Sequence, residues 1–249
     1  MTRRWPTLLL LAALGVLAAY LYARDAPNTS PEPRGGLTLD NTDDKRVYAS
    51  LALLAAAARG QVEPHQPPID PAYRDDVVAA GRELLRGPLG GFRDDCSGYV
   101  SAVFSTVDVP MDGFVASIWD QAVDHDTLHW QTRPEPGDVA FFDDTHDRNG
   151  NGAIDDPLTH IALVLDVEAD GTVLLAHGGT KRGRTTTRMN LEHPSIHKDA
   201  SGRVLNAWLR EIEPGDTPQT RYLTGELWVA WATIDPELDW QTHVPVIDG

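Results

Sequence analysis

The 249-residue sequence is poor in cysteine and in basic residues, which are abundant in disulfide-rich and in nucleic-acid-binding proteins, respectively. It has a single cysteine, Cys96, so no disulfide can form within the chain. Basic residues are outnumbered, with 21 Lys and Arg against 37 Asp and Glu and a formal net charge of -16. A nucleic-acid surface needs clustered basic side chains, so the composition argues against a nucleic-acid partner. The hydrophobic content of 41% is nevertheless that of an ordinary globular protein.

One long apolar run opens the chain. Residues 8–23 carry no charge, and Arg3 and Arg4 precede them. The pair of small residues that a signal peptidase requires does not follow the run, so retention is favoured over cleavage. We therefore expect residues 1–23 to form a single-pass signal anchor in the cell membrane, with the remaining chain on the outer, periplasmic or extracellular side. The alternative is a cleaved signal peptide and a secreted protein.

Composition divides the rest of the chain into four parts. Residues 24–41 are rich in Pro, Gly, Ser, Asn and Asp and bury too little apolar surface to fold, so they predict a flexible tether. Residues 42–69 predict a helix followed by a Pro-rich linker. Residues 70–235 hold the patterned sequence of the main domain, and residues 236–249 form a C-terminal tail.

Within residues 70–235, helical periodicity precedes strand-like runs. Asp70 caps a helix with Pro71 at its first position, and further helices are expected over 96–107 and 115–123. Five apolar runs with Gly, Asp and Pro between them predict strands. They are residues 139–142, 160–167, 172–176, 204–209 and 227–234. The order predicts an α+β fold in which N-terminal helices pack on a mostly antiparallel sheet.

The cysteine lies where a helix is expected to begin. Asp95-Cys96-Ser97-Gly98 directly precedes an apolar helical stripe. The unpaired N–H groups and the positive dipole end of a helix N-terminus favour the thiolate over the thiol. We therefore predict that Cys96 is a nucleophile with a lowered pKa. The alternative is a small buried hydrophobic residue, since an unpaired cysteine is often buried.

Two of the nine histidines, His160 and His177, lie at the ends of apolar strand-like runs. A hairpin with an even number of loop residues would place His177 opposite Ala162, diagonally across from His160 on one face of the sheet. One imidazole could then accept the thiol proton while the other orients it. The alternatives are two structural histidines, or a zinc site, although the spacing with Cys96 matches no compact zinc pattern.

These motifs together resemble the NlpC-type cell-wall cysteine peptidases, a papain-like family. In chain order they are Asp95-Cys96-Ser97-Gly98, Pro136-Gly137-Asp138 with the run 139–142, Thr159-His160-Ile161-Ala162, and Ala176-His177. The resemblance covers about residues 70–235. It implies Cys96 as nucleophile, His160 as base, His177 as the third polar residue, no cofactor for the chemistry, and cleavage of an amide bond in peptidoglycan stem peptides. The family's Tyr-x-x-Gly-Gly segment is replaced here by Gly87-Pro88-Leu89-Gly90-Gly91, which lacks the aromatic hydroxyl.

An acidic insertion, residues 143–156, leads into His160. Asp147, Asn149 and Asn151 alternate, and Gly152 and Asp155 follow, as in the first nine positions of an EF-hand calcium loop. The twelfth position is Leu158 rather than Glu, so Asp143, Asp144 or Asp156 would have to complete the coordination. The sequence predicts a structural Ca²⁺ held by Asp147, Asn149, Asn151 and Asp155. The alternative is a solvated turn.

Five tryptophans lie in or near the expected helices and strands of this domain. They are Trp119, Trp130, Trp208, Trp228 and Trp231. Such residues could line a groove for sugars or peptides, but tryptophans near strands belong more often to the core or its rim. We therefore expect a structural role for this set.

The sequence as a whole predicts an exported, membrane-tethered cysteine hydrolase of papain-like α+β fold. Its partners are peptidoglycan or its stem peptides and, through residues 1–23, the membrane. Two alternatives stay open. One is a non-catalytic, calcium-stabilised module that binds the cell wall, and the other is an acyl or amide transferase that uses the same thioester chemistry.

Overall fold

The computed structural model describes residues 68–218 and 220–240. The chain divides into two compact units, residues 1–62 and 63–249, and the described residues belong to the second. The predicted anchor (1–23), the tether (24–41) and nearly all of the segment 42–69 lie outside the described residues. Within the described ranges, no helix combines the length and the apolarity needed to cross a membrane.

Three of the helices form where periodicity and capping predict them. Helix α3 (Pro71–Leu84) has Asp70 as its N-cap, whose carboxylate accepts a hydrogen bond from Ala72 N at 2.9 Å, and proline at its first position. Helices α4 (Cys96–Ser105) and α5 (Val115–Asp124) match the two other expected helices. A single turn, α6 (Thr224–Leu227), precedes the last strand. The expected order of helices is therefore confirmed.

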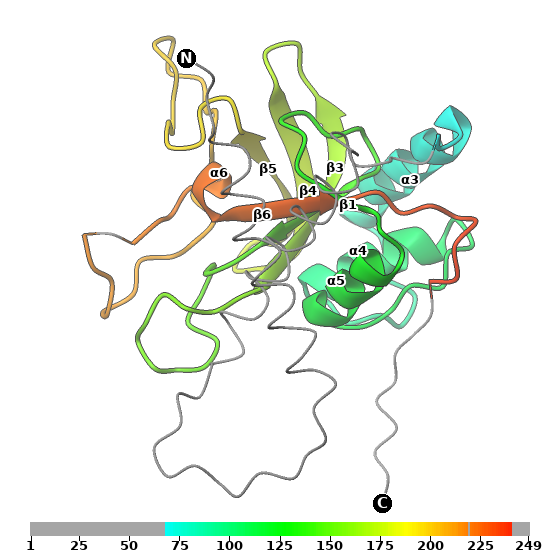
Figure 1. Ribbon diagram of the computed structural model, residues 1–249, viewed down its shortest axis with the longest axis horizontal. Coiled ribbons are helices and arrows are strands. Elements are labelled where there is room, and N and C mark those ends of the chain that lie inside the picture. Colours follow the sequence, from blue (N-terminus) through cyan, green and yellow to red (C-terminus); the bar gives the residue numbers. More distant parts are fainter. Residues whose placement is uncertain (1–67, 219, 241–249) are drawn as a thin grey trace, which may run out of the picture. The chain divides into compact units, whose positions relative to one another are not determined.

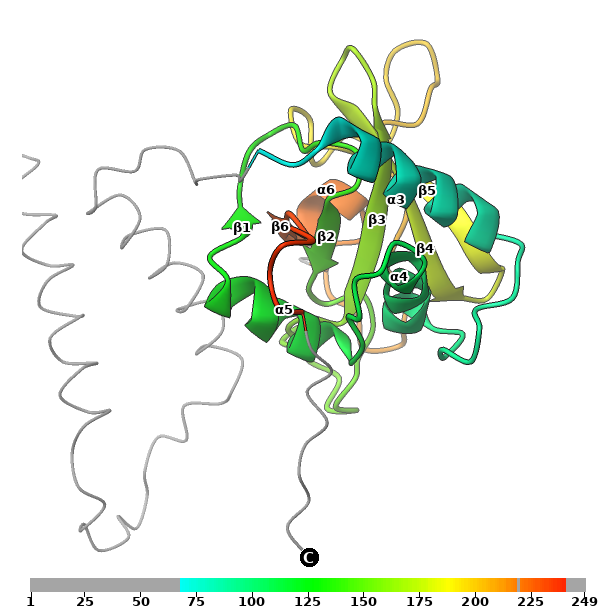
Figure 2. The ribbon, with the colours of Figure 1, turned by 90° about the vertical axis from the view of Figure 1, so that its right-hand side faces the viewer.

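The described strands form one antiparallel sheet (Figure 1). Their order is β1-β6-β2-β3-β4-β5 (Figure 2). The strands are β1 (Leu128–His129), β2 (Val139–Phe142), β3 (His160–Val167), β4 (Thr172–Thr180), β5 (Gly183–Asn190) and β6 (Trp228–Ala232). The helices and the antiparallel sheet confirm the α+β class. Strands β2 and β3 have the predicted bounds, because apolar runs that are buried along most of their length stand out in a sequence.

The short strand β1 was not predicted, β4 continues past residue 176 to Thr180, and two longer segments also differ from the prediction. Residues 204–209 form no strand and make only isolated bridges, Lys198 with Val204 and Trp208 with Leu223. This segment instead covers the sheet, and Leu209 packs on its core. Strand β5 was not expected, because its sequence Gly-Arg-Thr-Thr-Thr-Arg-Met-Asn is mostly polar. It forms an edge strand that is held along one side by β4.

The β3–β4 hairpin reaches the predicted register by a route that was not predicted. Val167 pairs with Val173, which leaves an odd number of residues in the loop rather than an even number. A β-bulge further along β3 shifts the pairing by one residue, and beyond it Leu163 pairs with Ala176. His177 therefore lies at the predicted position, diagonally across from the histidine that begins β3.

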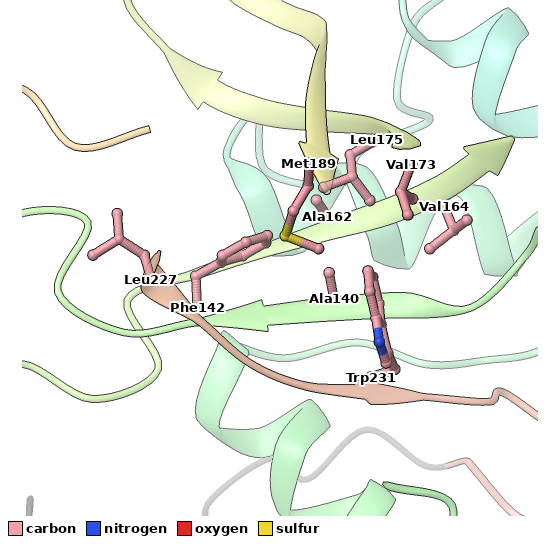
Figure 3. Packing of buried hydrophobic residues seen from close by; sticks show 9 residues of the cluster. All are labelled: Ala140, Phe142, Ala162, Val164, Val173, Leu175, Met189, Leu227 and Trp231. Carbon is pink, nitrogen blue, oxygen red and sulfur yellow. The ribbon is translucent and has the colours of Figure 1, made fainter. Parts of the chain in front are cut away.

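The two faces of the sheet are covered by different parts of the chain. Helices α3 and α4 pack over β3 and β4 (Figure 2), where Gly81 lies against Leu163 and the Tyr99 hydroxyl donates to the Gly81 carbonyl at 2.7 Å. The opposite face holds an apolar cluster drawn in Figure 3. Its members are Ala140, Phe142, Ala162, Val164, Val173, Leu175, Met189, Leu227 and Trp231. Because alternate strand residues face the same side, His160 and His177 lie on the side of this cluster.

The core extends past the predicted domain boundary at residue 235. The indole of Trp240 is buried, donates to the Asp235 carbonyl at 2.7 Å, and packs at 4.9 Å against the ring of His125. The first residues of the segment expected to be a tail, 236–240, are therefore part of the folded domain.

Candidate active site

Cys96 is the first residue of α4, and its neighbours explain why the helix begins there. The Asp95 carboxylate caps the helix by accepting from Gly98 N at 2.7 Å and from the Ser97 hydroxyl at 3.0 Å. Arg93 donates to the other Asp95 oxygen at 3.0 Å. A Cβ at position 98 would lie 2.1 Å from the Arg93 carbonyl oxygen, so only glycine fits there. The Asp-Cys-Ser-Gly motif therefore builds a rigid helix start around the thiol.

The sheet contacts this helix start through residues that adjoin the two histidines. A Cβ on Gly178 would lie 2.6 Å from the Asp95 carbonyl oxygen, and one on Gly179 would lie 3.1 Å from Cys96 N. Gly179 also has a positive φ of 71°. The backbone N–H of Ile161 donates to the Cys96 thiol. The end of β4 and the start of β3 thus both approach the cysteine.

His160 and His177 form a buried pair. His160 Nε2 and His177 Nδ1 are 2.8 Å apart, and the ring planes are nearly perpendicular, at 89°. One of these two nitrogens must donate and the other accept. If His160 carries its proton on Nε2, its Nδ1 has a free lone pair with which to accept a proton, and His177 Nδ1 is the acceptor of the hydrogen bond. The predicted contact between the two histidines is present in the fold.

Burial dominates the charge states of the three side chains. It raises the pKa of the Cys96 thiol above its ordinary value, and the nearby Asp95 carboxylate adds to the rise, while the N–H groups of Ile161 and Ser97 oppose it. The expected lowering of the Cys96 pKa is therefore wrong, because the cost of burying a thiolate exceeds the stabilisation from the helix N-terminus. Burial also lowers the pKa of His160 well below its ordinary value and that of His177 to about 4.

These three pKa shifts define the protonation state of the site before substrate binds. At neutral pH both imidazoles are neutral and the cysteine is protonated. The candidate site therefore comprises a protonated thiol and two neutral imidazoles rather than a preformed thiolate and imidazolium pair. Proton transfer from Cys96 has to accompany its attack on a substrate.

The motif Pro136-Gly137-Asp138 has a structural part. Asp138 is fully buried and accepts from Arg74 Nη1 at 2.9 Å, from the Thr233 hydroxyl at 3.0 Å and from Glu135 N at 2.9 Å. His129 Nε2 is 3.3 Å from the same carboxylate. The motif thus ties α3, β1 and the segment after β6 to the start of β2, and it supports the sheet rather than the chemistry.

The predicted calcium ligands gather in one exposed loop. Asp147 accepts from Gly150 N and Gly152 N at 2.7 and 2.8 Å. The side-chain amides of Asn149 and Asn151 donate to Asp155 at 3.2 to 3.3 Å. The donor set is one of oxygens, as Ca²⁺ prefers, but several of these oxygens already accept hydrogen bonds within the loop. In the described part of the chain, no group of three or more His, Cys, Asp or Glu side chains is arranged to hold a metal ion. Calcium binding by this loop stays a prediction.

Sequence reasoning did not identify two residues beside the site. His146 in the acidic insertion is close enough to His160 that a charge on it lowers the pKa of His160. Arg184 on β5 donates to the carbonyls of Leu84 and Gly87 at 2.5 and 2.6 Å and lies 3.1 Å from an Asp94 oxygen. It holds the loop that leads to the cysteine. His146 could have been found from its place in an insertion that ends at His160, whereas nothing in the sequence indicates Arg184.

Comparison with known proteins gives one family. A search of the curated proteins and a search of the solved structures each give no match. Residues 88–179 match the family model of the CHAP domain. This range contains Cys96, His160 and His177 together with the strands that carry the histidines. CHAP domains are typically amidases or peptidases that act on peptidoglycan.

The CHAP match can be compared with the resemblance to NlpC-type cell-wall peptidases that the sequence motifs indicate. It supports the papain-like, cell-wall part of that prediction, while the NlpC-type subtype is a finer assignment. Residues 88–179 are thus similar to the CHAP domain, which is consistent with the predicted resemblance to a papain-like peptidase or amidase family of cell-wall hydrolysis.

Proposed function

We propose that this domain is a cysteine hydrolase that cleaves an amide bond in the stem peptides of peptidoglycan. Cys96 is the nucleophile, His160 the general base and His177 the residue that orients His160. The observation that carries the proposal is the buried hydrogen bond of 2.8 Å between His160 and His177, beside a helix that begins at the chain's single cysteine. The CHAP match over the same residues supports the substrate class.

Acylation follows from the charge states described above. As the Cys96 sulfur attacks the amide carbonyl carbon, its proton moves to His160 Nδ1. The new imidazolium donates through Nε2 to His177 Nδ1, which stabilises the charge inside the buried site. The backbone N–H groups of Cys96 and Ser97, which lie against the sulfur, are the donors at the start of α4 that would stabilise the developing oxyanion. His160 then gives its proton to the leaving nitrogen, the C–N bond breaks, and a thioester on Cys96 remains.

Deacylation uses the same groups in reverse roles. His160 takes a proton from water as the water oxygen attacks the thioester carbonyl. Collapse of the tetrahedral species releases the carboxylic acid product, and the proton on His160 returns to the Cys96 sulfur. His177 can accept the hydrogen bond only in the neutral tautomer that carries its proton on Nε2, and its pKa of about 4 keeps the ring neutral over the neutral range.

The place of action follows from the substrate. Peptidoglycan lies outside the cytoplasmic membrane, so the proposal requires export. The uncharged run 8–23 behind Arg3 and Arg4 supports a single-pass anchor with the domain on the outer side. The full chain should stay with the membrane fraction after a high-salt wash. A soluble product that begins near residue 24 would instead indicate a secreted protein.

Digestion of purified peptidoglycan tests the proposal. Wild-type protein should release fragments whose masses, measured by mass spectrometry, identify one cut amide bond. Cys96→Ala and His160→Ala should release none, whereas His177→Ala should retain part of the activity, because an orienting group is less essential than the base. Wall degradation by Cys96→Ala would refute the proposal. Binding without any product would favour the wall-binding alternative, and product that requires an added amine would favour the transferase.

A further inference from the structure

Trp208 is the most exposed tryptophan among the described residues, in which Trp130 and Trp228 are half-buried. Trp208 is 56% exposed, whereas Trp119, Trp231 and Trp240 are at most 2% exposed. It lies on the irregular segment 191–223 between β5 and α6, outside the range that matches the CHAP domain. An indole left in water on an ordered segment is the kind of apolar surface that marks a binding site.

Two further rings flank this indole. The ring of His197 is 5.8 Å from that of Trp208, and the ring of Tyr222 is 5.4 Å from it on another stretch of the segment. The three rings form what we call the aromatic platform. His197 Nδ1 donates to the Asn206 carbonyl at 2.7 Å, and the Tyr222 hydroxyl donates to Asp216 at 3.1 Å. The planes of the His197 and Tyr222 rings are inclined to the Trp208 indole by 61° and 50°, so the platform is a set of tilted ring faces with polar atoms at their edges.

The platform is held rigidly from below. The fully buried Asn206 side chain accepts from Asn190 N at 2.8 Å and donates to the carbonyls of His193 and Ile196 at 2.8 and 3.0 Å. The bridge between Trp208 and Leu223 fixes the backbone under the indole. A binding surface with this much internal support loses little conformational entropy when a ligand binds.

The same segment is connected to the candidate active site. The buried Arg210 donates to the Asp144 carbonyl at 2.7 Å, and Asp144 belongs to the insertion that ends at His160. On the other side, Ala207 N donates to the Arg188 carbonyl on β5 at 3.0 Å, three residues along that strand from the partner of His177. Three residues of a strand span about 10 Å. The segment that carries the platform therefore contacts both the insertion that ends at His160 and the strand that pairs with β4 beside His177.

We propose that the aromatic platform of Trp208, His197 and Tyr222 binds the sugar rings of the wall glycan while the stem peptide lies at Cys96. This rests on the proposed function. Sugar rings present flat C–H faces to aromatic rings and hydroxyl groups to polar atoms beside them, and the platform offers both. Residues 191–223 carry no excess of positive charge that would favour a polyanion or an anionic lipid as the occupant. The acidic side chains are Glu192, Asp199, Glu211, Glu213 and Asp216, and the basic ones are Lys198, Arg203, Arg210 and Arg221.

Binding of a stem-free sugar tests the platform separately from catalysis. The probe is the soluble hexamer of N-acetylglucosamine, added to the Cys96→Ala variant and followed by calorimetry. Trp208→Ala in the same background should weaken binding by about five- to tenfold. Val123→Ala, which truncates another exposed apolar side chain on α5, should change it by less than about twofold. Circular dichroism checks that both variants are folded.

Three results would overturn the proposal. The first is hexamer binding that Trp208→Ala leaves unchanged. The second is no hexamer binding by the parent protein. If Trp208→Ala then still reduced sedimentation with intact peptidoglycan, the platform would recognise the peptide and not the sugar. The third is Trp208-dependent binding to phosphatidylglycerol vesicles with no hexamer binding. Hydrolysis of a soluble stem peptide by the wild-type protein is measured in parallel. Failure of hydrolysis in wild type would refute the proposed function and leave the sugar test intact.

Discussion

Acid should destabilise the domain through His177. Burial lowers the pKa of this imidazole in the folded protein to about 4, from an ordinary value of 6.5. Between these values the unfolded chain binds a proton that the folded domain excludes. The contribution of neutral His177 to the free energy of unfolding is therefore fully present above pH 6.5 and is lost as the pH falls towards 4. The difference in pKa corresponds to about 3 kcal/mol of unfolding free energy. His160 adds to the effect in the same direction, because burial and the neighbouring His177 lower its pKa too.

Urea denaturation at a series of pH values from 7 to about 4.5 measures this effect. The free energy of unfolding of the wild type should fall steeply below about pH 6.5. That of His177→Asn should fall less steeply, because asparagine does not titrate. The slope is compared rather than the absolute stability, since the substitution also changes packing. His193→Asn, which replaces an exposed histidine, is the matched control and should keep the wild-type slope. Equal slopes for wild type and His177→Asn would refute the reasoning.

Three more predictions concern residues around the site. Because burial raises the Cys96 pKa, iodoacetamide should alkylate the folded protein slowly at pH 7, and the rate should still be rising above the ordinary thiol pKa of about 8.5. Fast alkylation at pH 6 would show a thiolate instead. Arg184→Ala should lower the free energy of unfolding by about 2 to 4 kcal/mol in urea denaturation, because two carbonyl groups lose a charged donor, and an unchanged midpoint would contradict this. Millimolar calcium should raise the melting temperature, and Asp147→Ala with Asp155→Ala should remove the shift; identical melting curves with calcium and with chelator would reduce the loop to a turn.

Much of the site could be predicted from the sequence because its signals are local. Asp95 before Cys96 and Gly98 after it mark a helix start whatever the rest of the fold does, and the structure shows that cap. The run from His160 to Val167 is apolar over most of its length, so the strand and its bounds were visible. The hairpin placed His177 across from His160 because two antiparallel neighbours share a face at fixed spacing.

Other features depend on which segments meet in space. The polar segment β5 forms a strand because it pairs with the edge of β4. Residues 204–209, whose sequence predicts a strand, make only isolated bridges and cover the sheet. The bulge in β3 corrected a loop length that was predicted wrongly. Asp138 was singled out as part of a motif, but only the fold shows that it is fully buried against Arg74.

The protonation state of Cys96 shows most clearly the difference between what local sequence determines and what the tertiary structure determines. The sequence by itself determined that Cys96 begins a helix, and a helix N-terminus taken alone lowers the pKa of a thiol. Only the tertiary structure decided how much water the thiol loses, because the end of β4 and the start of β3 close over it. Desolvation depends on every atom that surrounds a group, wherever in the chain that atom comes from, and so no local pattern could have predicted that burial would outweigh the helix.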